Sequence, residues 1–212
     1  MDRQTVVLKL NVTEDELWAN YSSVHKRNVR KAMRSKLTCG QMNLSQGIDQ
    51  FRGLYLQTMA RLGAPQYYNF SGAYFDSLVT LMSDRSRVFV VKLANRIVAA
   101  GIFLLHRPVL HYHLGGSDVD HLELRPNNLL FHEVALWGLH NGYHQLHLGG
   151  GRTPDAEDGL FRFKAGIGHG RLGFCTARRI HNRPVYDHLC ALWMRRSAVD
   201  SRPAYFLLYR LG

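Results

Sequence analysis

The chain has 212 residues, and 46% of them are hydrophobic, a globular composition that excludes a disordered polymer. A formal charge of +11, from 27 Lys and Arg against 16 Asp and Glu, favours a polyanionic partner: nucleic acid, a phosphorylated substrate or an anionic membrane surface. The three cysteines form no CxxC pair, which argues against a zinc ribbon or a disulfide framework; with no apolar signal segment and no membrane span in the sequence, we expect a cytoplasmic protein.

The N-terminal part of the chain alternates between strand and helix signals. Thr5–Asn11 alternates like a strand, and Thr13 with Glu16 forms a capping box that opens a helix. Apolar residues spaced along one helical face predict a helix over 48–62 and another that is capped by Ser71. The same part also contains a predicted helix over 23–36 and a short predicted strand over 38–44.

The C-terminal part begins with three strands in quick succession and then changes period. Pro126 suits the first turn of a helix, and Gly142 suits its end. Pro184 begins a last helix with an apolar side. The predicted strands cover residues 87–93, 97–106, 109–115, 143–148, 172–181 and 205–209, and the predicted helices cover 126–140, 160–167 and the segment from 184.

This order of elements predicts an α/β fold in which a mixed sheet is flanked by helices on both faces. It is also the order of the GNAT acyltransferase core, which the chain resembles in this respect. No repeat or long linker interrupts the sequence. We therefore predict one domain, a single GNAT-like lobe, over residues 1–212.

Residues 26–36 carry six basic side chains and no acidic one. On a helix, four of the six share one face, where like charges repel each other. A phosphate-rich ligand would relieve that repulsion, so we predict that this face binds a polyanionic substrate, with a solvated helix face as the alternative. The four residues are Arg27, Arg30, Lys31 and Arg34.

The segment Leu160–Gly168 sets a lysine among aromatic side chains. A lysine that is held rigidly in a low-dielectric cleft suits the stabilisation of an oxyanion in acyl transfer. A lysine that reaches out to solvent is the alternative. We predict that Lys164 is catalytic and that Phe163 lines the same site.

A third candidate region joins the end of the strand over 109–115 to the helix that starts at Pro126. Backbone amides at a helix N-terminus can hold an anion or a carbonyl oxygen. A GNAT enzyme that uses acetyl-CoA is expected to have a Gln/Arg-x-x-Gly-x-Gly/Ala loop here, but Pro126 supplies no N–H and no glycine follows it, which argues against CoA. The candidate substrate-binding residues of this region are Tyr112, His113, Asn127 and Asn128.

The twelve histidines show no HxxxH-type pairing on a helix, so we predict no metal site. His111 and His113 share a strand face, and His144 and His147 flank the short strand before the triple glycine. A histidine is expected as general base, because a neutral imidazole can deprotonate an incoming ammonium. The sequence does not select one of the twelve.

Several segments, in the same order, are similar to the second GNAT-like lobe of the Fem family, over nearly the whole chain. The more specific elements are Lys-Arg-Asn-x-x-Lys-Ala at 26–32 and Phe-Lys-x-Gly-x-Gly at 163–168. The other similar segments are residues 7–10, 14–18, 126–130, 149–151 and 205–210.

Fem transferases move an amino acid from aminoacyl-tRNA to an amine of a peptidoglycan precursor. The resemblance implies aminoacyl-tRNA as co-substrate and no further cofactor. The resemblance gives Lys164 the role of the lysine that stabilises the transfer intermediate. It places Arg27 and Arg30 on the side of the site that binds substrate and tRNA. Fem enzymes have two lobes and this chain has one, so we expect a peptide or peptidyl-nucleoside acceptor, an antibiotic precursor more than a cell-wall one.

Two other functions stay open at this point. One is an acyl-CoA-dependent GNAT N-acyltransferase, against which the missing glycine loop argues. The other is a non-catalytic RNA-binding module. A cleft that contains Lys164 would favour either of the two transferases over such a module. The sequence indicates neither the amino acid, the tRNA and the acceptor nor the oligomeric state.

Overall fold

The computed structural model describes residues 2–197, 201 and 203–210. Contacts divide the chain into two compact units, Met1–Phe174 and Cys175–Gly212. The prediction of one domain over residues 1–212 stays a prediction.

The first unit is built on a mixed sheet of seven strands in the order β2-β3-β4-β5-β6-β1-β7. The β5–β6 pair is parallel, and every other neighbouring pair is antiparallel. The α/β mixed sheet predicted from the order of elements is confirmed. The strands are β1 (Arg3–Lys9), β2 (Leu37–Met42), β3 (Ser86–Leu93), β4 (Arg96–His106), β5 (Val109–Ser117), β6 (Gln145–Gly149) and β7 (Gly170–Phe174).

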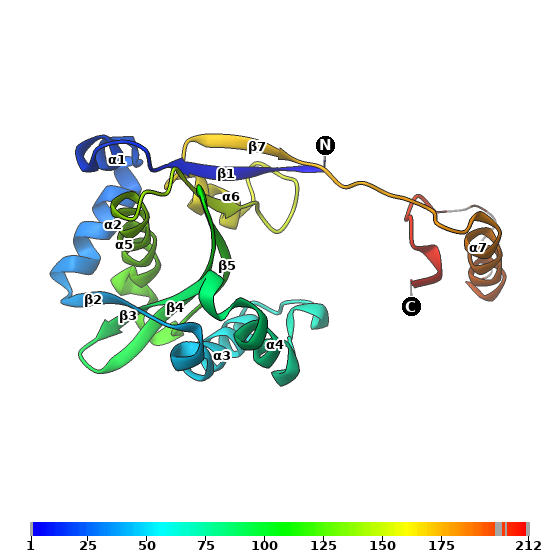
Figure 1. Cartoon of the computed structure of the whole chain (residues 1–212), viewed down its shortest axis with the longest axis horizontal. Helices are drawn as coiled ribbons and strands as arrows, with labels where there is room; N and C mark the ends of the chain where they lie inside the picture. Colours follow the sequence, from blue (N-terminus) through cyan, green and yellow to red (C-terminus); the bar gives the residue numbers. More distant parts are fainter. Residues whose placement is uncertain (1, 198–200, 202, 211–212) are drawn as a thin grey trace. The chain divides into compact units, whose positions relative to one another are not determined.

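Helices cover both faces of this sheet, with α1, α2, α5 and α6 on one face and α3 and α4 on the other (Figure 1). No helix in the described part of the chain is long and apolar enough to cross a membrane. The α-helices are α1 (Glu14–Asn20), α2 (Ser23–Arg34), α3 (Leu44–Arg61), α4 (Gly72–Met82), α5 (Pro126–His140), α6 (Gly159–Ala165) and α7 (Arg183–Ser197). The short 3-10 helices are η1 (Gln66–Tyr68), η2 (Ser83–Arg85), η3 (Val119–Leu124) and η4 (Leu208–Arg210).

The sheet separates two apolar cores. Because successive strand residues point to opposite faces, Phe103 of β4 packs in the core under α5, whereas its neighbour Ile102 packs in the core under α3 and α4. Leu17 and Val29 bring α1 and α2 into the first core. Residues of α5 and α6 are buried in the same core, and their burial fixes the positions of these two helices relative to β5.

The helix starts follow the predicted signals. The N–H of Thr13 donates to the Glu16 carboxylate at 2.8 Å, and the N–H of Glu16 donates to the Thr13 hydroxyl at 3.2 Å, which is the predicted capping box. Pro126 is the first residue of α5, as predicted. Arg125 before it has a left-handed backbone with φ of 63°.

Two predicted strands differ from the structure, because one ends earlier than predicted and the other is absent. The strand predicted over 172–181 is β7, which ends at Phe174. Phe174 pairs with Arg3, the first residue of β1, so the residues after it have no neighbouring strand to pair with. The strand predicted over 205–209 is also absent: this segment turns back on α7, where the Tyr186 hydroxyl donates to the Phe206 carbonyl at 2.6 Å.

Candidate active site

An opening in the sheet lies between β5 and β6. These strands pair at three positions, the last of which joins His111 to His147. β5 continues to Ser117 and β6 to Gly149 without further pairing between the two. The strands therefore separate beyond this point.

A cavity of about 330 Å³ adjoins the unpaired end of β5. A wider hollow of about 410 Å³ lies by Gln50, Arg96 and Asp118, but it contains none of the predicted site residues. The smaller cavity is therefore the candidate active site. It is lined by Thr58, Met59, Arg61 and Leu62 at the end of α3, by Tyr112, Gly115, Gly116 and Ser117 of β5, by Asn127 and Phe131 of α5, and by Gly159, Leu160, Phe163 and Lys164 of α6.

Lys164 lines this cavity with 6% of its surface exposed. Its Nζ donates to the carbonyl of Gly150 at 2.7 Å and lies 5.6 Å from the ring centroid of Tyr112. Burial lowers the pKa of Lys164 to about 8, and the negative charge of Asp158 opposes that shift. An ammonium has three N–H donors, so two remain to meet the oxygen of a ligand.

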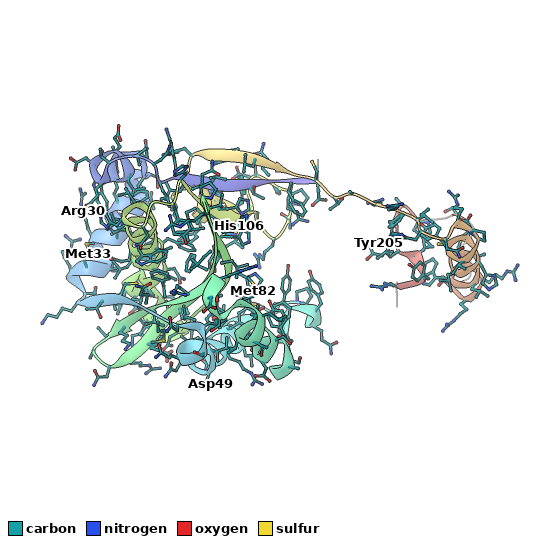
Figure 2. All side chains as sticks on the ribbon, in the orientation of Figure 1. Arg30, Met33, Asp49, Met82, His106 and Tyr205 are labelled. Carbon is teal, nitrogen blue, oxygen red and sulfur yellow. The ribbon has the colours of Figure 1, made fainter. Side chains whose placement is uncertain are left out.

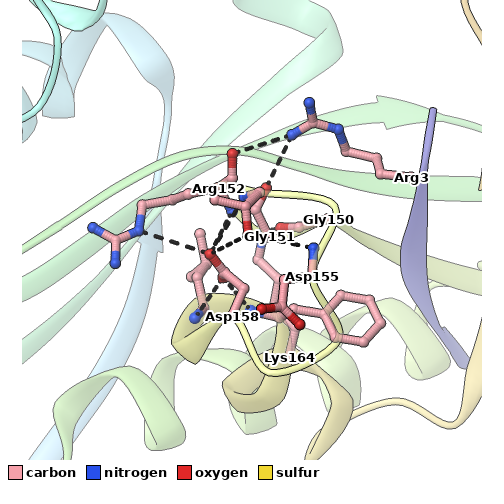
Figure 3. Close-up of polar contacts among 10 residues, drawn as sticks. Arg3, Gly150, Gly151, Arg152, Asp155, Asp158 and Lys164 are labelled. Atoms are coloured by element: carbon pink, nitrogen blue, oxygen red, sulfur yellow. Dashed lines mark hydrogen bonds and ion pairs between the residues drawn. The ribbon is translucent and has the colours of Figure 1, made fainter.

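Asp158 holds the loop that leads from Gly150 to α6 (Figure 3). Its carboxylate is buried and caps α6. Burial raises the pKa of Asp158, but four backbone N–H groups outweigh that effect and hold the pKa below its usual range. The carboxylate is thus charged, and it fixes both the loop and the helix that carries Lys164. The donors are the N–H groups of Arg152, Thr153, Leu160 and Phe161, at 2.9 to 3.3 Å.

The end of β5 is tied to two helices. The Ser117 N–H donates to the Thr58 hydroxyl of α3 at 2.9 Å, and the Asn127 amide of α5 donates to the Ser117 hydroxyl at 3.3 Å. Gly116 allows α3 to approach closely, because a Cβ there would lie 2.7 Å from the backbone of Leu54. These contacts give the cavity a rigid wall opposite α6.

The structure brings four of the ten predicted site residues together at the cavity and leaves six apart, of which two are Asn128 and His113. Asn128 is buried and turned toward α2, where its amide contacts Nδ1 of His25 at 2.8 Å. His113 contacts the hydroxyl of Tyr74 at 2.7 Å through Nε2 and does not line the cavity. The four residues that do line it are Tyr112, Asn127, Phe163 and Lys164.

The predicted basic face lies on α2, and none of its four residues lines the cavity. All four side chains are exposed, and Arg30 lies on the outer side of the helix (Figure 2), with its guanidinium 5.3 Å from the ring centroid of Trp18. The opposite stripe of α2, which includes Val29 and Ala32, is buried. Within the described residues, the four make no ion pair, and no group of three or more His, Cys, Asp or Glu side chains gathers to hold a metal.

The sequence also matches a known family. Residues 23–165, which run from the start of α2 to the end of α6, match the acetyltransferase (GNAT) domain. The chain belongs to the GNAT acetyltransferase family. A comparison with curated proteins found no match.

Solved structures share this GNAT fold at low sequence identity. FemX is 15% identical with a TM-score of 0.71, and the match covers 89% of this chain and 64% of FemX. The C-terminal domain of a protein described as a lysylphosphatidylglycerol synthetase, from Agrobacterium fabrum, is 14% identical with a TM-score of 0.55, over 78% of this chain and 56% of that one. An aminoglycoside acetyltransferase from an uncultured soil metagenomic sample, in complex with sisomicin, is 14% identical with a TM-score of 0.51, over 69% of this chain and 97% of that one.

The α3 wall of the GNAT cavity was missed from the sequence. None of Thr58, Met59, Arg61 and Leu62 was a predicted site residue. One signal was present: Thr58 is a polar residue on the apolar face of the helix predicted over 48–62. Its hydroxyl binds β5, so the residue is buried for a structural reason and also forms part of the wall.

Proposed function

We propose that this GNAT domain transfers an aminoacyl group from aminoacyl-tRNA to an amine of a peptide or peptidyl-nucleoside acceptor. The observation that carries the proposal is Lys164, a buried cation beside a cavity with aromatic walls. A preorganised positive charge in such a site stabilises the oxyanion of acyl transfer far better than it would in water.

The reaction needs little acid–base machinery, because the ester of aminoacyl-tRNA is already activated. The acceptor amine attacks the ester carbonyl, and negative charge develops on the carbonyl oxygen. In the proposal this oxygen meets the two free N–H donors of Lys164, while the third stays on the Gly150 carbonyl. The C–O bond to the ribose then breaks, and the amide is formed.

The first turn of α5 supports an aminoacyl-tRNA donor over CoA. Pyrophosphate binding requires several free backbone amides at this turn. Here Arg125 donates its N–H to Leu122, Pro126 has none, and Asn128 donates to the Arg125 carbonyl. Among residues 125–128, only the N–H of Asn127 has no hydrogen-bond partner in the described structure.

The size of the cavity favours a smaller acceptor than a cell-wall precursor. Its volume is about 330 Å³, and a short peptide or peptidyl-nucleoside amine suits that size. The chain spans 64% of the length of FemX, and the structural likeness to FemX supports the proposed donor.

Acyl-CoA transfer is the second candidate. The observation in its favour is the aminoglycoside acetyltransferase, 97% of which is covered by the match, so that its whole length corresponds to one lobe of this kind. Under this alternative Lys164 would keep its role, because the oxyanion is the same.

A parallel transfer assay distinguishes these functions. The same acceptor amine is offered with aminoacyl-tRNA in one reaction and with acyl-CoA in another, and the amide product is measured by mass spectrometry. We expect product with aminoacyl-tRNA only. Product with acyl-CoA only would establish the second candidate, and product with neither would contradict both.

A further inference from the structure

Two histidines face each other where β5 and β6 begin to separate. His111 and His147 form the last pair of the parallel ladder. Their Nδ1 atoms lie 2.9 Å apart, and their rings are nearly parallel, with 4.9 Å between the ring centroids and an interplanar angle of 16°. Both side chains are half-buried.

The hydrogen bonds of this pair fix which nitrogen carries each proton. The Thr5 hydroxyl lies 3.3 Å from the Leu172 carbonyl, which can only accept, so Thr5 donates there. Nε2 of His147, 3.1 Å from the same hydroxyl, must then be its N–H donor.

The remaining contact follows from the first two. A neutral His147 that carries its proton on Nε2 has a bare Nδ1, so His111 donates its Nδ1–H to it. The Nε2 of His111 is therefore an unprotonated lone pair. It has no hydrogen-bond partner among the described residues, and it is not sealed from solvent.

The pair lies at the inner end of the opening between β5 and β6, and neither histidine is among the residues that line the cavity. Burial and then the positive charge of Lys164 lower the pKa of His147, and the same charge acts on His111, so the ammonium and the two imidazoles interact across this opening. Burial lowers the pKa of His111 to about 4, helped by His147, His113 and the charge of Lys164. His111 is thus neutral at physiological pH.

We propose that Nε2 of His111 carries the proton from the attacking amine to the leaving oxygen, with His147 and Thr5 holding the imidazole in the tautomer that this requires. The proposal rests on the proposed function, because the leaving oxygen is that of the aminoacyl ester. It selects one histidine from the twelve in the sequence.

The proton balance is complete without another reactant. The neutral amine attacks the carbonyl, a C–N bond forms, and the nitrogen becomes an ammonium in the tetrahedral adduct. This ammonium is a stronger acid than the free one, and it gives a proton to Nε2 of His111. As the adduct collapses and the C–O bond breaks, the imidazolium returns that proton to the leaving oxygen. His111 ends neutral, and the products are an amide and a hydroxyl.

Asparagine substitutions separate the two histidines. His111→Asn keeps a donor to Nδ1 of His147 but removes the Nε2 lone pair, so we expect single-turnover transfer to fall about 10²–10⁴-fold at unchanged acceptor KM, as for loss of a general base. His147→Asn keeps an acceptor for the His111 N–H, so we expect a loss smaller than tenfold. His106→Asn, at the exposed end of β4, is the matched control.

Chemical rescue distinguishes proton transfer from a structural role. We expect imidazole to restore part of the rate of a His111→Ala variant, and substituted imidazoles to restore more as their pKa rises. No rescue in a variant that keeps its Tm would overturn the shuttle, as would a wild-type rate in His111→Asn. A wild-type protein that uses neither acyl donor would instead overturn the proposed function, and the shuttle with it.

Nitrogen NMR tests the tautomers without any turnover. In the wild-type protein at pH 7 we expect protonated Nδ1 on His111 and protonated Nε2 on His147. The reverse assignment would overturn the proposal, because His111 would then have no free lone pair at Nε2.

Discussion

Cations occur in two very different settings in this molecule. Lys164 is a single buried ammonium beside a cavity, whereas α2 carries four exposed cations on one helical face. The ammonium of Lys164 has one fixed partner, the Gly150 carbonyl, and a pKa lowered to about 8 by burial. The α2 side chains have no ion-pair partner among the described residues, and water surrounds them.

The difference teaches which kind of work each cation can do. A desolvated charge acts strongly on one atom at short range, because little water screens it. Exposed charges act weakly and collectively on a polyanion, and salt screens them. Lys164 therefore suits the chemical step, and α2 suits the capture of a phosphate-rich substrate. Four predictions test this contrast.

Loss of the buried charge is expected to have the largest effect. Lys164→Met keeps the length and apolar packing of the side chain, so the protein should fold. We expect the single-turnover rate of transfer to fall about 10²–10³-fold with little change in tRNA affinity, as for removal of one oxyanion donor. Lys164→Arg should recover part of the rate, because it keeps the charge with a different geometry.

Two results of this experiment would contradict the prediction. A folded Lys164→Met protein that transfers at the wild-type rate would remove the catalytic assignment. Equal losses of rate and affinity would make Lys164 a binding residue, and the oxyanion would then have to be met by backbone amides near Gly115 or Asn127.

Neutralising the exposed charges should change binding and not chemistry. We expect the Arg27→Gln, Arg30→Gln, Lys31→Gln triple variant to bind tRNA more weakly and with a shallower salt dependence. If all three contact phosphates, the loss of affinity between 50 and 200 mM salt should shrink by roughly 40-fold, from about 0.9 counterions released per contact. Arg195→Gln and Arg196→Gln on α7 are the control; an unchanged salt slope in the triple variant would show a merely solvated face.

The pH dependence should show the buried lysine directly. Because burial lowers its pKa to about 8, Lys164 is charged below that pH and loses its proton as the pH rises through it. We expect the ratio of wild-type to Lys164→Arg rates to fall about tenfold between pH 7 and pH 9, since arginine stays protonated. This ratio removes the titration of the acceptor amine, and a flat ratio would mean that the charge of Lys164 does not act on the rate.

For CoA we expect no binding at all. Calorimetric titration with CoA should give no measurable binding, because the first turn of α5 offers one free amide in place of a pyrophosphate cradle. Aminoacyl-tRNA serves as the positive control in the same buffer. Micromolar CoA affinity would favour the acyl-CoA candidate.

The sequence by itself determined most of the elements and singled out Lys164 as the candidate catalytic residue. The capping box of Thr13 and Glu16 and the position of Pro126 are local signals, because a helix start is satisfied by residues within one turn. The three strands over 86–117 were close to those predicted, since alternation and turn residues are also local. The aromatic residues around Lys164 were also apparent from the sequence, because they are its near neighbours in the chain.

Tertiary structure decided everything that depends on a distant partner. β7 ends at Phe174 because β1 starts at Arg3, and no local signal in 175–181 records that. Asn128 turns inward because His25 of α2 lies there. Burial of apolar faces brings the strands and helices together and so creates contacts that sequence spacing does not specify. Three examples are the α3 wall of the cavity, the contact between His111 and His147, which are 36 residues apart, and the hydrogen bond from Lys164 to the Gly150 carbonyl.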